Sequence, residues 1–311
     1  MSTADRTPRS FSPSATAVGD FDFTAGQVDV AAMTAAYRRH GAVVIRGLSS
    51  AYVADLLRDM EAILKQSQAL LPEAATAKHH ANAVTTPDGT LFNADPSDPG
   101  RMVVNTLRLN AMISGAFLRS LVNPELLELL AALIGPDIEL WKWGQCVYKQ
   151  PRTGVPKSLH QDGYYFEHKL QSPTAVLSYA VDVDMGNAPL YVVPGSHELG
   201  LVRHEDDRWA GFALNDPVWW ERAVPIEGGA GDAVIFHTCT IHGSPDNRSD
   251  RPRPVFIKRY RRADDFCVID VANVADRQRA EQAPITAKTE DDWGLMVRGI
   301  RRYQPERESS S

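Results

Sequence analysis

The spacing of apolar residues predicts helices in the first part of the chain and strands in most of the rest. Residues 28–64 have the pattern of a helix, then the short β-branched segment AVVIRGL, then a second helix with apolar residues at helical spacing. The clearest helix is NPELLELLAALIG, because Asn123 suits the N-cap, Pro124 the first turn and Gly135 the C-terminal end. Helices therefore come first along the chain.

After Gly135 the pattern changes to that of strands. Short segments rich in β-branched and aromatic residues are separated by Gly, Pro, Asn and Asp. These segments are IELWKWGQCVYKQP, TAVLSYAVDVD, PLYVVPGS, GDAVIFH and RPVFIKRYR. Because strands follow helices in this way, we expect a β-barrel-like or sandwich core with helices packed outside it.

Three segments are expected to be loops that shape any binding site: residues 66–100, 163–172 and 203–222. The first is dense in turn-forming residues, and a loop of that length is either a functional lid or a mobile segment. The last contains three tryptophans that we expect to pack against the core, Trp209, Trp219 and Trp220.

Composition and charge narrow the class of protein. The chain has 311 residues, of which 43% are hydrophobic, enough for one large core or two modest domains. Its formal net charge of −6 leaves no basic excess to attract nucleic acid or an anionic membrane. No apolar run reaches the roughly 18 residues that span a bilayer, and the first residues lack the apolar segment of a secretory signal. We therefore expect a cytoplasmic protein.

The cysteines and the termini complete this picture. Three cysteines form no CxxC pair, which argues against disulfides and against a thiolate zinc site. Buried free thiols are expected at Cys146, Cys239 and Cys267. Residues 1–18 are rich in Ser, Thr, Pro and Ala, and residues 304–311 read QPERESSS. We expect both to be disordered tails on a single domain of residues 19–303.

The segment SLHQDGYYFEH, at 158–168, is the first candidate for chemistry. Residues i and i+2 of a strand point to the same face, so His160 and Asp162 would project together, as two ligands of one ion require. The HxD tripeptide is weak on its own, because a chain with nine histidines can contain it by chance. A metal site needs a further ligand from elsewhere in the chain.

A second segment, GDAVIFHTCTIHGSPDNRSDRPRPVFIKRYR, offers His237 and His242 as that ligand. Eleven residues after His242 lies Arg253, at the start of a predicted strand. Two imidazoles and a carboxylate on one face of iron form the triad of non-haem Fe(II) oxygenases, which leaves coordination positions open. An arginine nearby is a rigid clamp for a carboxylate. The spacing therefore supplies three ligands and an anchor for an acidic cosubstrate.

Three motifs in order carry a resemblance to a known family: HQD at 160–162, NAPLYVVPGSHELG at 187–200 and HTCTIHGSPDNRSDRPR at 237–253. Together they resemble the phytanoyl-CoA dioxygenase family of Fe(II)/2-oxoglutarate-dependent oxygenases, and RRHGAVVIRGLSSAYVADLL resembles the opening of that family. The similarity extends from about residue 30 to residue 262. It implies an α+β, mainly β fold: a double-stranded β-helix, or jelly roll, with a cupin-like core and flanking helices.

The resemblance implies a role for each matching residue. His160, Asp162 and His242 match the iron ligands. Arg253 matches the residue that pairs with the distal carboxylate of 2-oxoglutarate, and Ser244 matches a hydroxyl that hydrogen-bonds the same carboxylate. The resemblance therefore implies Fe(II), 2-oxoglutarate and O₂ as the cofactor and cosubstrates.

The resemblance also implies two further cofactor contacts. Gln145 falls where the family places a 2-oxoglutarate contact on the strand before the HxD motif, and Arg108 falls near another basic contact. One departure from the family pattern is Ala188, which stands where glycine is usual before the PGSH strand. We expect the effect of this departure to be mild.

His237 is the main competitor for the third ligand position. We prefer His242, because only His242 is followed by Gly-Ser and by the correctly spaced arginine. His237 is then a packing residue or lies behind the ligands. His197, in the PGSH motif, is expected to bond to nearby backbone. His168 is expected at the surface or in a loop.

The remaining aromatic, basic and histidine residues have simpler expected roles. Tyr164, Tyr165 and Phe166 follow the ligands directly, so at least one is expected to line the site. Trp141 and Trp143 are two residues apart and are expected to share a core face. The charged run KRYRR, at 258–262, is expected to be a solvated strand end. His79 and His80 are expected in a loop, and would touch substrate if that loop is a lid.

The resemblance implies an activity as well as a fold. It implies that oxidative decarboxylation of 2-oxoglutarate to succinate and CO₂ is coupled to oxidation of an unactivated C–H bond of a small molecule, in specialised metabolism or catabolism. A carboxylate at Asp162 argues for hydroxylation, desaturation or cyclisation and against halogenation, which needs that ligand position open. The alternatives are a cupin-like metal enzyme that does not use 2-oxoglutarate and a non-catalytic binding protein on the same scaffold. The sequence indicates neither the substrate nor the oligomeric state.

Overall fold

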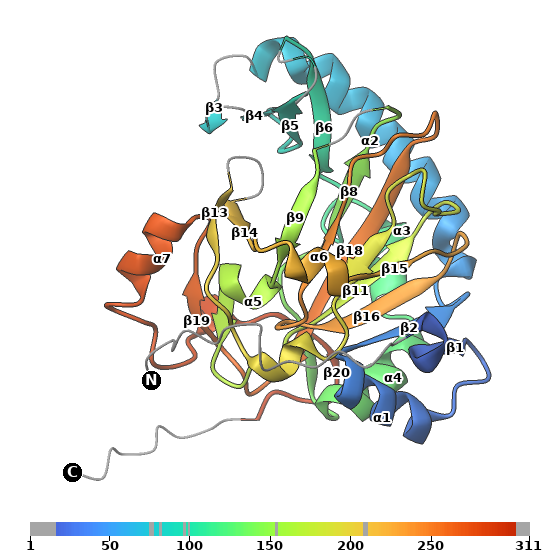
Figure 1. Ribbon diagram of the computed structural model, residues 1–311, viewed down its shortest axis with the longest axis vertical. Coiled ribbons are helices and arrows are strands. Elements are labelled where there is room, and N and C mark those ends of the chain that lie inside the picture. Colours follow the sequence, from blue (N-terminus) through green and yellow to red (C-terminus); the bar gives the residue numbers. More distant parts are fainter. Residues whose placement is uncertain are drawn as a thin grey trace.

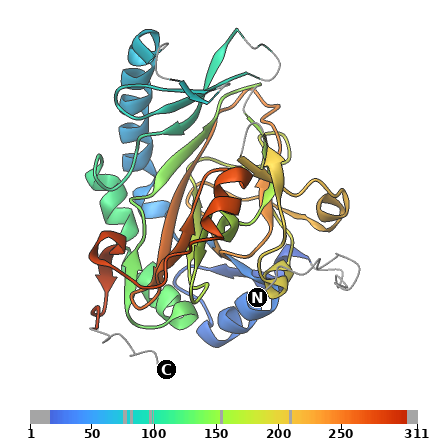
Figure 2. The ribbon, with the colours of Figure 1, turned by 90° about the vertical axis from the view of Figure 1, so that its left-hand side faces the viewer.

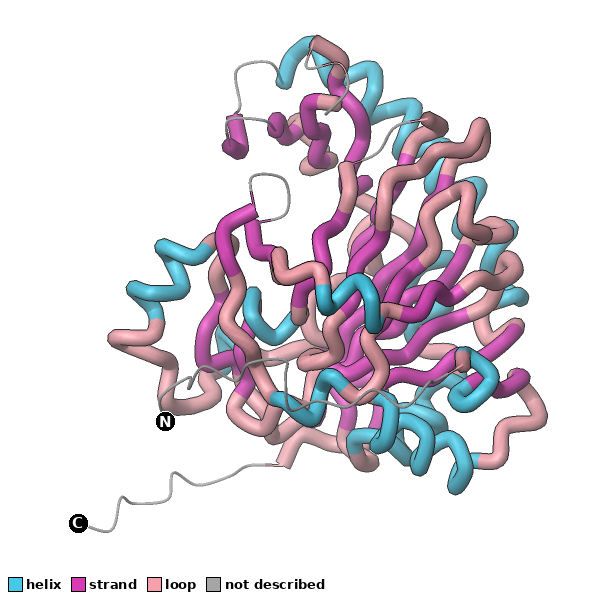
Figure 3. The backbone as a smooth tube through the Cα atoms, in the orientation of Figure 1, coloured by secondary structure: helices cyan, strands magenta, loops and turns pink. Residues whose placement is uncertain are grey.

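The computed structural model describes residues 17–74, 78–80, 83–95, 98, 100–152, 155–207 and 211–302 (Figure 1). Within these residues β-strands form the centre of the molecule and most helices lie at its periphery, as Figure 3 shows. The two predicted tails fall almost entirely outside the described residues, although Val18 begins the first described 3₁₀ helix. Among the described helices, none combines the length and the apolar composition that crossing a bilayer requires.

The larger sheet has twelve strands among the described residues. Ten of them are hydrogen-bonded in this order: β1 (Asp22–Thr24), β2 (Ala42–Arg46), β16 (Ala233–His237), β11 (Thr174–Tyr179), β18 (Arg253–Arg262), β8 (Gln145–Lys149), β6 (Met102–Leu107), β5 (Leu91–Ala94), β4 (Ala83–Thr85) and β3 (Lys78–His80). The other two are β7 (Ile138–Leu140), which pairs with the end of β18, and β20 (Leu295–Arg298), which pairs with β7.

The smaller sheet has the order β15 (Val224–Ile226), β12 (Leu190–Val192), β17 (His242–Ser244) and β9 (Lys157–His160). Two antiparallel pairs lie apart from both sheets: β10 (Phe166–His168) with β19 (Cys267–Asp270), and β13 (Glu205–Asp207) with β14 (Gly211–Ala213).

Successive strands of the chain alternate between the two sheets. The chain passes through β8 in the larger sheet, β9 in the smaller, β11 in the larger, β12 and β15 in the smaller, and then β16, β17 and β18 in alternation. The inner faces meet where Phe236 packs on His242, with ring centroids 4.5 Å apart. This winding is a double-stranded β-helix, so the predicted jelly-roll fold is confirmed.

Helices cover the larger sheet and connect the strands (Figure 2). The α-helices are α1 (Val30–His40), α2 (Val53–Ala74), α3 (Gly115–Leu121), α4 (Pro124–Ile134), α5 (Asp162–Tyr165), α6 (Val218–Arg222) and α7 (Val274–Ala280). The 3₁₀ helices are η2 (Val18–Phe21), η3 (Ser50–Tyr52), η4 (Ser196–Leu199) and η5 (Glu290–Asp292). The predicted ends of α4 are confirmed, because the Asn123 side chain accepts a hydrogen bond from the Glu125 amide at 3.1 Å and Gly135 follows the last turn.

The charged end of β18 is not solvated, so that prediction is wrong. Lys258, Tyr260 and Arg261 are fully buried, and only Arg262 is exposed. Outward-facing residues of β18 meet the C-terminal end of α3, where backbone carbonyls lack partners within the helix. Lys258 Nζ donates to the Ser120 carbonyl at 2.9 Å, and Tyr260 Oη donates to the Leu121 carbonyl at 2.8 Å. These polar tips therefore cap a helix inside the core.

Burial of Lys258 gives the stability of the fold a specific pH dependence. Burial lowers the pKa of Lys258 from 10.5 to about 7. Below pH 7 the folded protein holds a buried charge, which lowers its free energy of unfolding. As the pH rises from 7 toward 10.5, Lys258 is neutral in the folded protein but still charged in the unfolded chain, so this destabilisation decreases. We expect Lys258→Met to raise the free energy of unfolding most below pH 7, with the gain shrinking by up to about 1.4 kcal/mol per pH unit above it.

Urea unfolding of both proteins at pH 6 and pH 9 measures this difference. Lys142→Met is the matched control, because the Lys142 side chain is half exposed and its Nζ forms an ion pair with Asp270 Oδ1 at 3.0 Å. Its effect on the free energy of unfolding should be small and the same at both pH values. A Lys258→Met effect that does not change with pH would contradict the prediction.

Of three further core predictions, two have mixed outcomes and one is confirmed. Trp141 is buried, but Trp143 is 44% exposed, because β7 ends at Leu140 and left-handed backbone at Lys142 and Gly144 turns the chain. The three cysteines are buried and free, as predicted. Trp219 packs in a small apolar cluster with Leu159, whereas Trp220 is exposed, and Trp209 lies outside the described residues.

Candidate active site

Two histidines come from neighbouring strands of the smaller sheet. His160 is the last residue of β9 and His242 the first of β17, and the two face each other in register. Each Nδ1 lies within hydrogen-bond distance of the carbonyl two residues earlier, Ser158 at 2.8 Å and Thr240 at 2.9 Å. A carbonyl can only accept, so each Nδ1 carries the proton and each Nε2 keeps its lone pair for a metal.

Asp162 reaches these histidines in a different way from the one predicted. The strand ends at His160, and Asp162 begins the short helix α5, so the alternation of side chains along a strand does not explain its position. Gln161 makes the turn: its side chain is buried and donates to the carbonyls of Gly200 and Cys239 at 2.7 and 2.6 Å. The predicted juxtaposition of His160 and Asp162 is nevertheless present.

The three predicted ligands form one buried cluster. Asp162 Oδ1 lies 3.7 Å from His160 Nε2 and 3.8 Å from His242 Nε2. Burial lowers the pKa of both imidazoles, that of His160 well below its usual value, so both are neutral at pH 7. Burial by itself raises the pKa of Asp162, but the Arg259 guanidinium and the two imidazoles together outweigh this, hold the pKa well below its usual value and keep the carboxylate ionised. Two neutral imidazoles and one carboxylate fit a divalent iron ion.

Arg259 was not identified from the sequence, yet it contacts this cluster directly. Its Nε donates to Asp162 Oδ2 at 3.0 Å, and its Nη2 lies 3.5 Å from Oδ1. Strand alternation was the available signal, because Arg259 is an even number of residues from Arg253 on β18 and therefore points to the same face. Because the sequence predicts a solvated strand end here, it gives Arg259 no role in the site.

Arg253 is a buried cation for which the described part of the chain offers no acidic partner. Its side chain lies at the start of β18, and burial lowers its pKa to about 10. Nε donates to the Ala188 carbonyl at 2.9 Å, and among the described residues no carboxylate forms an ion pair with it. Ala188 itself has φ 73°, the left-handed region where glycine is favoured, so its departure from the family pattern costs about 1 kcal/mol. A buried unpaired guanidinium calls for an anion.

Lys149 links Arg253 to the segment that follows His242. It lies opposite Arg253 in the pairing of β8 with β18. Its Nζ donates to the carbonyls of Ser244, at 3.1 Å, and Pro245. Ser244 is buried at the end of β17, so Lys149 connects the strand position opposite Arg253 with the backbone at Ser244. That the Arg253 and Ser244 side chains both contact 2-oxoglutarate stays a prediction.

The two other predicted cofactor contacts lie in different surroundings. Gln145 starts β8 opposite Ile257, and its side chain therefore shares the inner face of the sheet with Arg253. Arg108 is exposed after β6, where its side-chain carbons pack against Gly89 and its amide donates to Thr90 Oγ1 at 3.0 Å. Contact of either side chain with 2-oxoglutarate stays a prediction.

His237, His197 and His168 lie outside the ligand cluster and make other contacts. His237 Nδ1 accepts from the Cys239 amide at 3.1 Å, so His242 and not His237 joins the metal ligands. His197 bonds backbone as expected, with Nε2 3.0 Å from the Arg38 carbonyl. The surface prediction for His168 is wrong, because its ring is buried against Trp141 and lies 2.8 Å from Arg261 Nη1. The side chains of His79 and His80 lie outside the described residues.

One of the three aromatic residues after the ligands lies beside them. The ring of Tyr165 meets that of His160 edge-on, with centroids 5.6 Å apart, and its hydroxyl accepts from Lys157 Nζ at 2.9 Å. Tyr164 instead stacks on His204 at 4.1 Å, and Phe166 packs on Trp141. Of these three residues, Tyr165 is therefore the one whose ring lies against a predicted ligand.

The sequence profile of the phytanoyl-CoA dioxygenase (PhyH) family matches residues 37–255, more than half of the chain. The chain belongs to this family. The predicted resemblance is thus confirmed, and the matched region contains all three cluster residues together with Arg253. Family membership and the donor set together indicate iron and 2-oxoglutarate as the cofactor and cosubstrate.

Curated relatives of this PhyH-family chain include enzymes with different substrates. The peroxisomal phytanoyl-CoA dioxygenase of Mus musculus is 28% identical over 183 residues, which cover 56% of this chain and 53% of the relative. The L-proline trans-4-hydroxylase of Streptomyces griseoviridis is 28% identical over 162 residues, which cover 45% of this chain and 60% of the relative. The chain spans about half the length of the curated relatives it matches.

Solved structures show the same fold. The non-heme monooxygenase ThoJ aligns with a TM-score of 0.59 at 18% identity, covering 88% of this chain and 84% of that one. The alpha-ketoglutarate-dependent epimerase SnoN from nogalamycin biosynthesis aligns with a TM-score of 0.57 at 20% identity, covering 89% and 98%. At these identities the likeness establishes the fold of the PhyH-family chain and not its reaction.

Proposed function

We propose that this protein is an Fe(II)- and 2-oxoglutarate-dependent dioxygenase that hydroxylates, or otherwise oxidises, an unactivated C–H bond of a small molecule in specialised metabolism. Relatives named as a proline hydroxylase and as a nogalamycin-pathway epimerase support a small-molecule substrate. The complete triad supports oxidation without halogenation, because Asp162 occupies the position that a halide would need.

The observation that carries the proposal is Arg253. A metal site alone would suit many reactions, including those of cupin-like enzymes that do not use 2-oxoglutarate. A guanidinium that is 3% exposed and has no ion-pair partner among the described residues needs a carboxylate from outside the chain. The distal carboxylate of 2-oxoglutarate is such a group, and Arg253 offers it a bidentate contact.

The residues of the site have two roles: some hold the metal and others hold the cosubstrate. When bound, iron and 2-oxoglutarate supply the oxidant from O₂, and 2-oxoglutarate leaves as succinate and CO₂. His160, Asp162 and His242 hold the metal, whereas Arg253 and Ser244 fix the far end of the cosubstrate. The protein therefore contributes orientation and a buried, water-poor environment.

Anaerobic titration of the metal-free protein with Fe(II) and then 2-oxoglutarate tests the proposal. The expected result is a visible charge-transfer band that needs both additions. Arg253→Ala should lower the affinity for 2-oxoglutarate on the order of 100-fold, because the distal carboxylate loses a buried charge partner, while iron still binds.

Arg251→Ala is the matched control, since Arg251 is two residues away, half exposed and paired with Asp184 on the surface. It should leave the 2-oxoglutarate titration unchanged. A folded wild-type protein that binds iron and gives no band with 2-oxoglutarate would favour the cupin-like alternative. Substrate screening by succinate release would follow a positive result.

A further inference from the structure

The two oxygens of Asp162 lie in different surroundings, although Arg259 contacts both. Oδ1 points to the space between the histidines, 3.7 Å from His160 Nε2 and 3.8 Å from His242 Nε2. Oδ2 accepts a hydrogen bond from Arg259 Nε at 3.0 Å, whereas the contact of Arg259 Nη2 with Oδ1 is longer, at 3.5 Å. Oδ1 is therefore the carboxylate oxygen that is placed to bind a metal together with both imidazoles.

The Arg259 guanidinium is held firmly in this position. Its strand, β18, is hydrogen-bonded to β11 on one side and, at Arg259 itself, the backbone carbonyl accepts from the Trp141 amide at 2.8 Å. The guanidinium carbon lies 5.2 Å from the centre of the Phe166 ring, a cation–π contact. The side chain is 14% exposed, so the ion pair with Asp162 is shielded from water.

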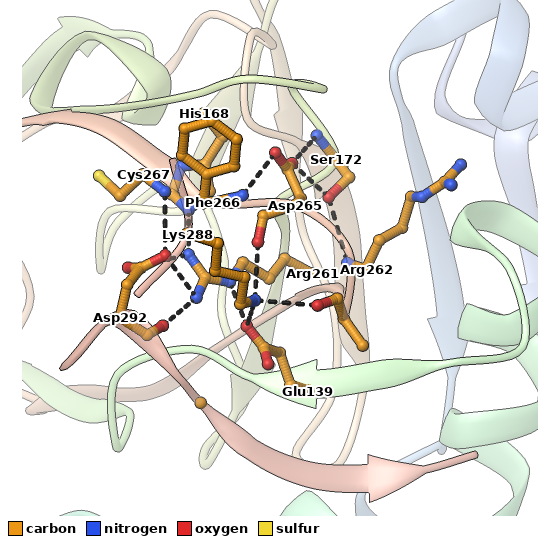
Figure 4. Close-up of polar contacts among 12 residues, drawn as sticks. Glu139, His168, Ser172, Arg261, Arg262, Asp265, Phe266, Cys267, Lys288 and Asp292 are labelled. Atoms are coloured by element: carbon orange, nitrogen blue, oxygen red, sulfur yellow. Dashed lines mark hydrogen bonds and ion pairs between the residues drawn. The ribbon is translucent and has the colours of Figure 1, made fainter. Parts of the chain in front are cut away.

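The next inward-facing cation on the same strand has another role. Arg261 donates to Glu139 Oε1 at 2.5 Å and also contacts Asp292 and His168, in the network that Figure 4 shows. Arg261 is thus fully engaged by these partners, and Glu139 also pairs with Lys288 and Arg301, which ties the end of β18 to the C-terminal segment. Arg259 is thus the basic residue of β18 that reaches the metal carboxylate.

We propose that Arg259 is a positioning residue that makes Asp162 a one-oxygen metal ligand. A carboxylate free to turn can bind through both oxygens and fill two coordination positions. Two histidines and one carboxylate oxygen would leave coordination positions open for 2-oxoglutarate and O₂, as non-haem Fe(II) oxygenases require. By holding Oδ2, Arg259 keeps one of these positions open. This inference rests on the iron site of the proposed function.

The geometry separates two contributions of Arg259. Its positive charge neutralises the buried carboxylate. Its planar guanidinium, with several N–H donors in a fixed arrangement, sets the orientation of the carboxylate. Arg259→Lys keeps the charge but has no fork, whereas Arg259→Met keeps much of the length and removes both. If positioning matters, lysine should restore the metal affinity only in part and should leave the coordination altered.

Cobalt(II), added to the metal-free protein in place of iron, provides a readout that does not depend on turnover. Its affinity is measured by calorimetry, and its visible absorption reports the coordination number. Arg259→Met is expected to weaken binding about 10–100-fold, as loss of a partner that orients a ligand does elsewhere, and to change the spectrum. Arg259→Lys is expected to bind more tightly than Arg259→Met and to retain the altered spectrum.

Arg262→Gln is the matched control on the same strand, because Arg262 is exposed and paired with Asp264. It should bind cobalt as the wild type does. If both Arg259 variants match the wild type in affinity and spectrum, the inference is overturned while the iron site stands. If the wild type binds no cobalt, the proposed function itself fails. Should Arg259→Met not fold, Arg259→Lys alone decides: an unchanged cobalt spectrum overturns the inference.

Discussion

Replacing Asp162 by asparagine is expected to abolish 2-oxoglutarate turnover and to lower the affinity for iron by more than about 100-fold, beyond the loss typical of partners behind the ligands. The substitution keeps the shape of the side chain but removes the one anionic donor of the cluster. It also leaves the partly buried Arg259 guanidinium without its carboxylate. Equilibrium dialysis with Fe(II) and an assay of succinate release measure the two effects.

The exposed carboxylate of Asp206, on β13, provides the control for a general effect of removing one negative charge. Asp206→Asn should keep iron affinity and succinate release within a few-fold of the wild type. An Asp162→Asn protein that is folded and holds iron as tightly as the wild type would remove Asp162 from the ligand set. The metal would then have to be held in another way.

The second large effect is expected at Glu139, in the network of Figure 4. Its carboxylate is fully buried and accepts from Arg261, Lys288 and Arg301. Burial raises the pKa of Glu139, but the cations outweigh this and hold it below its usual value. Glu139→Gln leaves buried cations without their anion, so we expect the free energy of unfolding to fall by about 3–5 kcal/mol.

Denaturant unfolding of Glu139→Gln and Glu128→Gln measures this effect with its control. Glu128 also binds an arginine of the C-terminal segment, Arg298, but its side chain is 70% exposed. Its substitution should therefore cost less than about 1 kcal/mol. Equal effects of the two substitutions would show that the buried network does not hold the C-terminal segment in place.

The ligands could be predicted from the sequence, whereas the path of the chain between them could not. His160, Asp162, His242 and Arg253 were named from motif order and spacing, and the structure brings the three ligands together. The strand was expected to continue through Asp162. It ends earlier because the buried Gln161 side chain satisfies backbone carbonyls from distant segments, and those partners have no signature in the local sequence.

The basic residues of β18 show a second limit of what the sequence predicts. A run of four charges within five residues is usually solvated, and the partners that bury it come from elsewhere in the chain: Ser120, Asp162 and Glu139. Alternation alone would have placed Arg253, Arg259 and Arg261 on one face. The roles of these three arginines follow only once this face is known to be the interior of the two packed sheets.

The place of β18 in the larger sheet has a consequence for synthesis. β18 lies between β8 and β11, although the chain reaches it only after residue 252. Until then both neighbours present unpaired edges, which are templates for aggregation. A nascent or truncated chain that ends before β18 should therefore need protection by chaperones. Late arrival of a central strand also makes the topology strongly non-local, which favours slow folding.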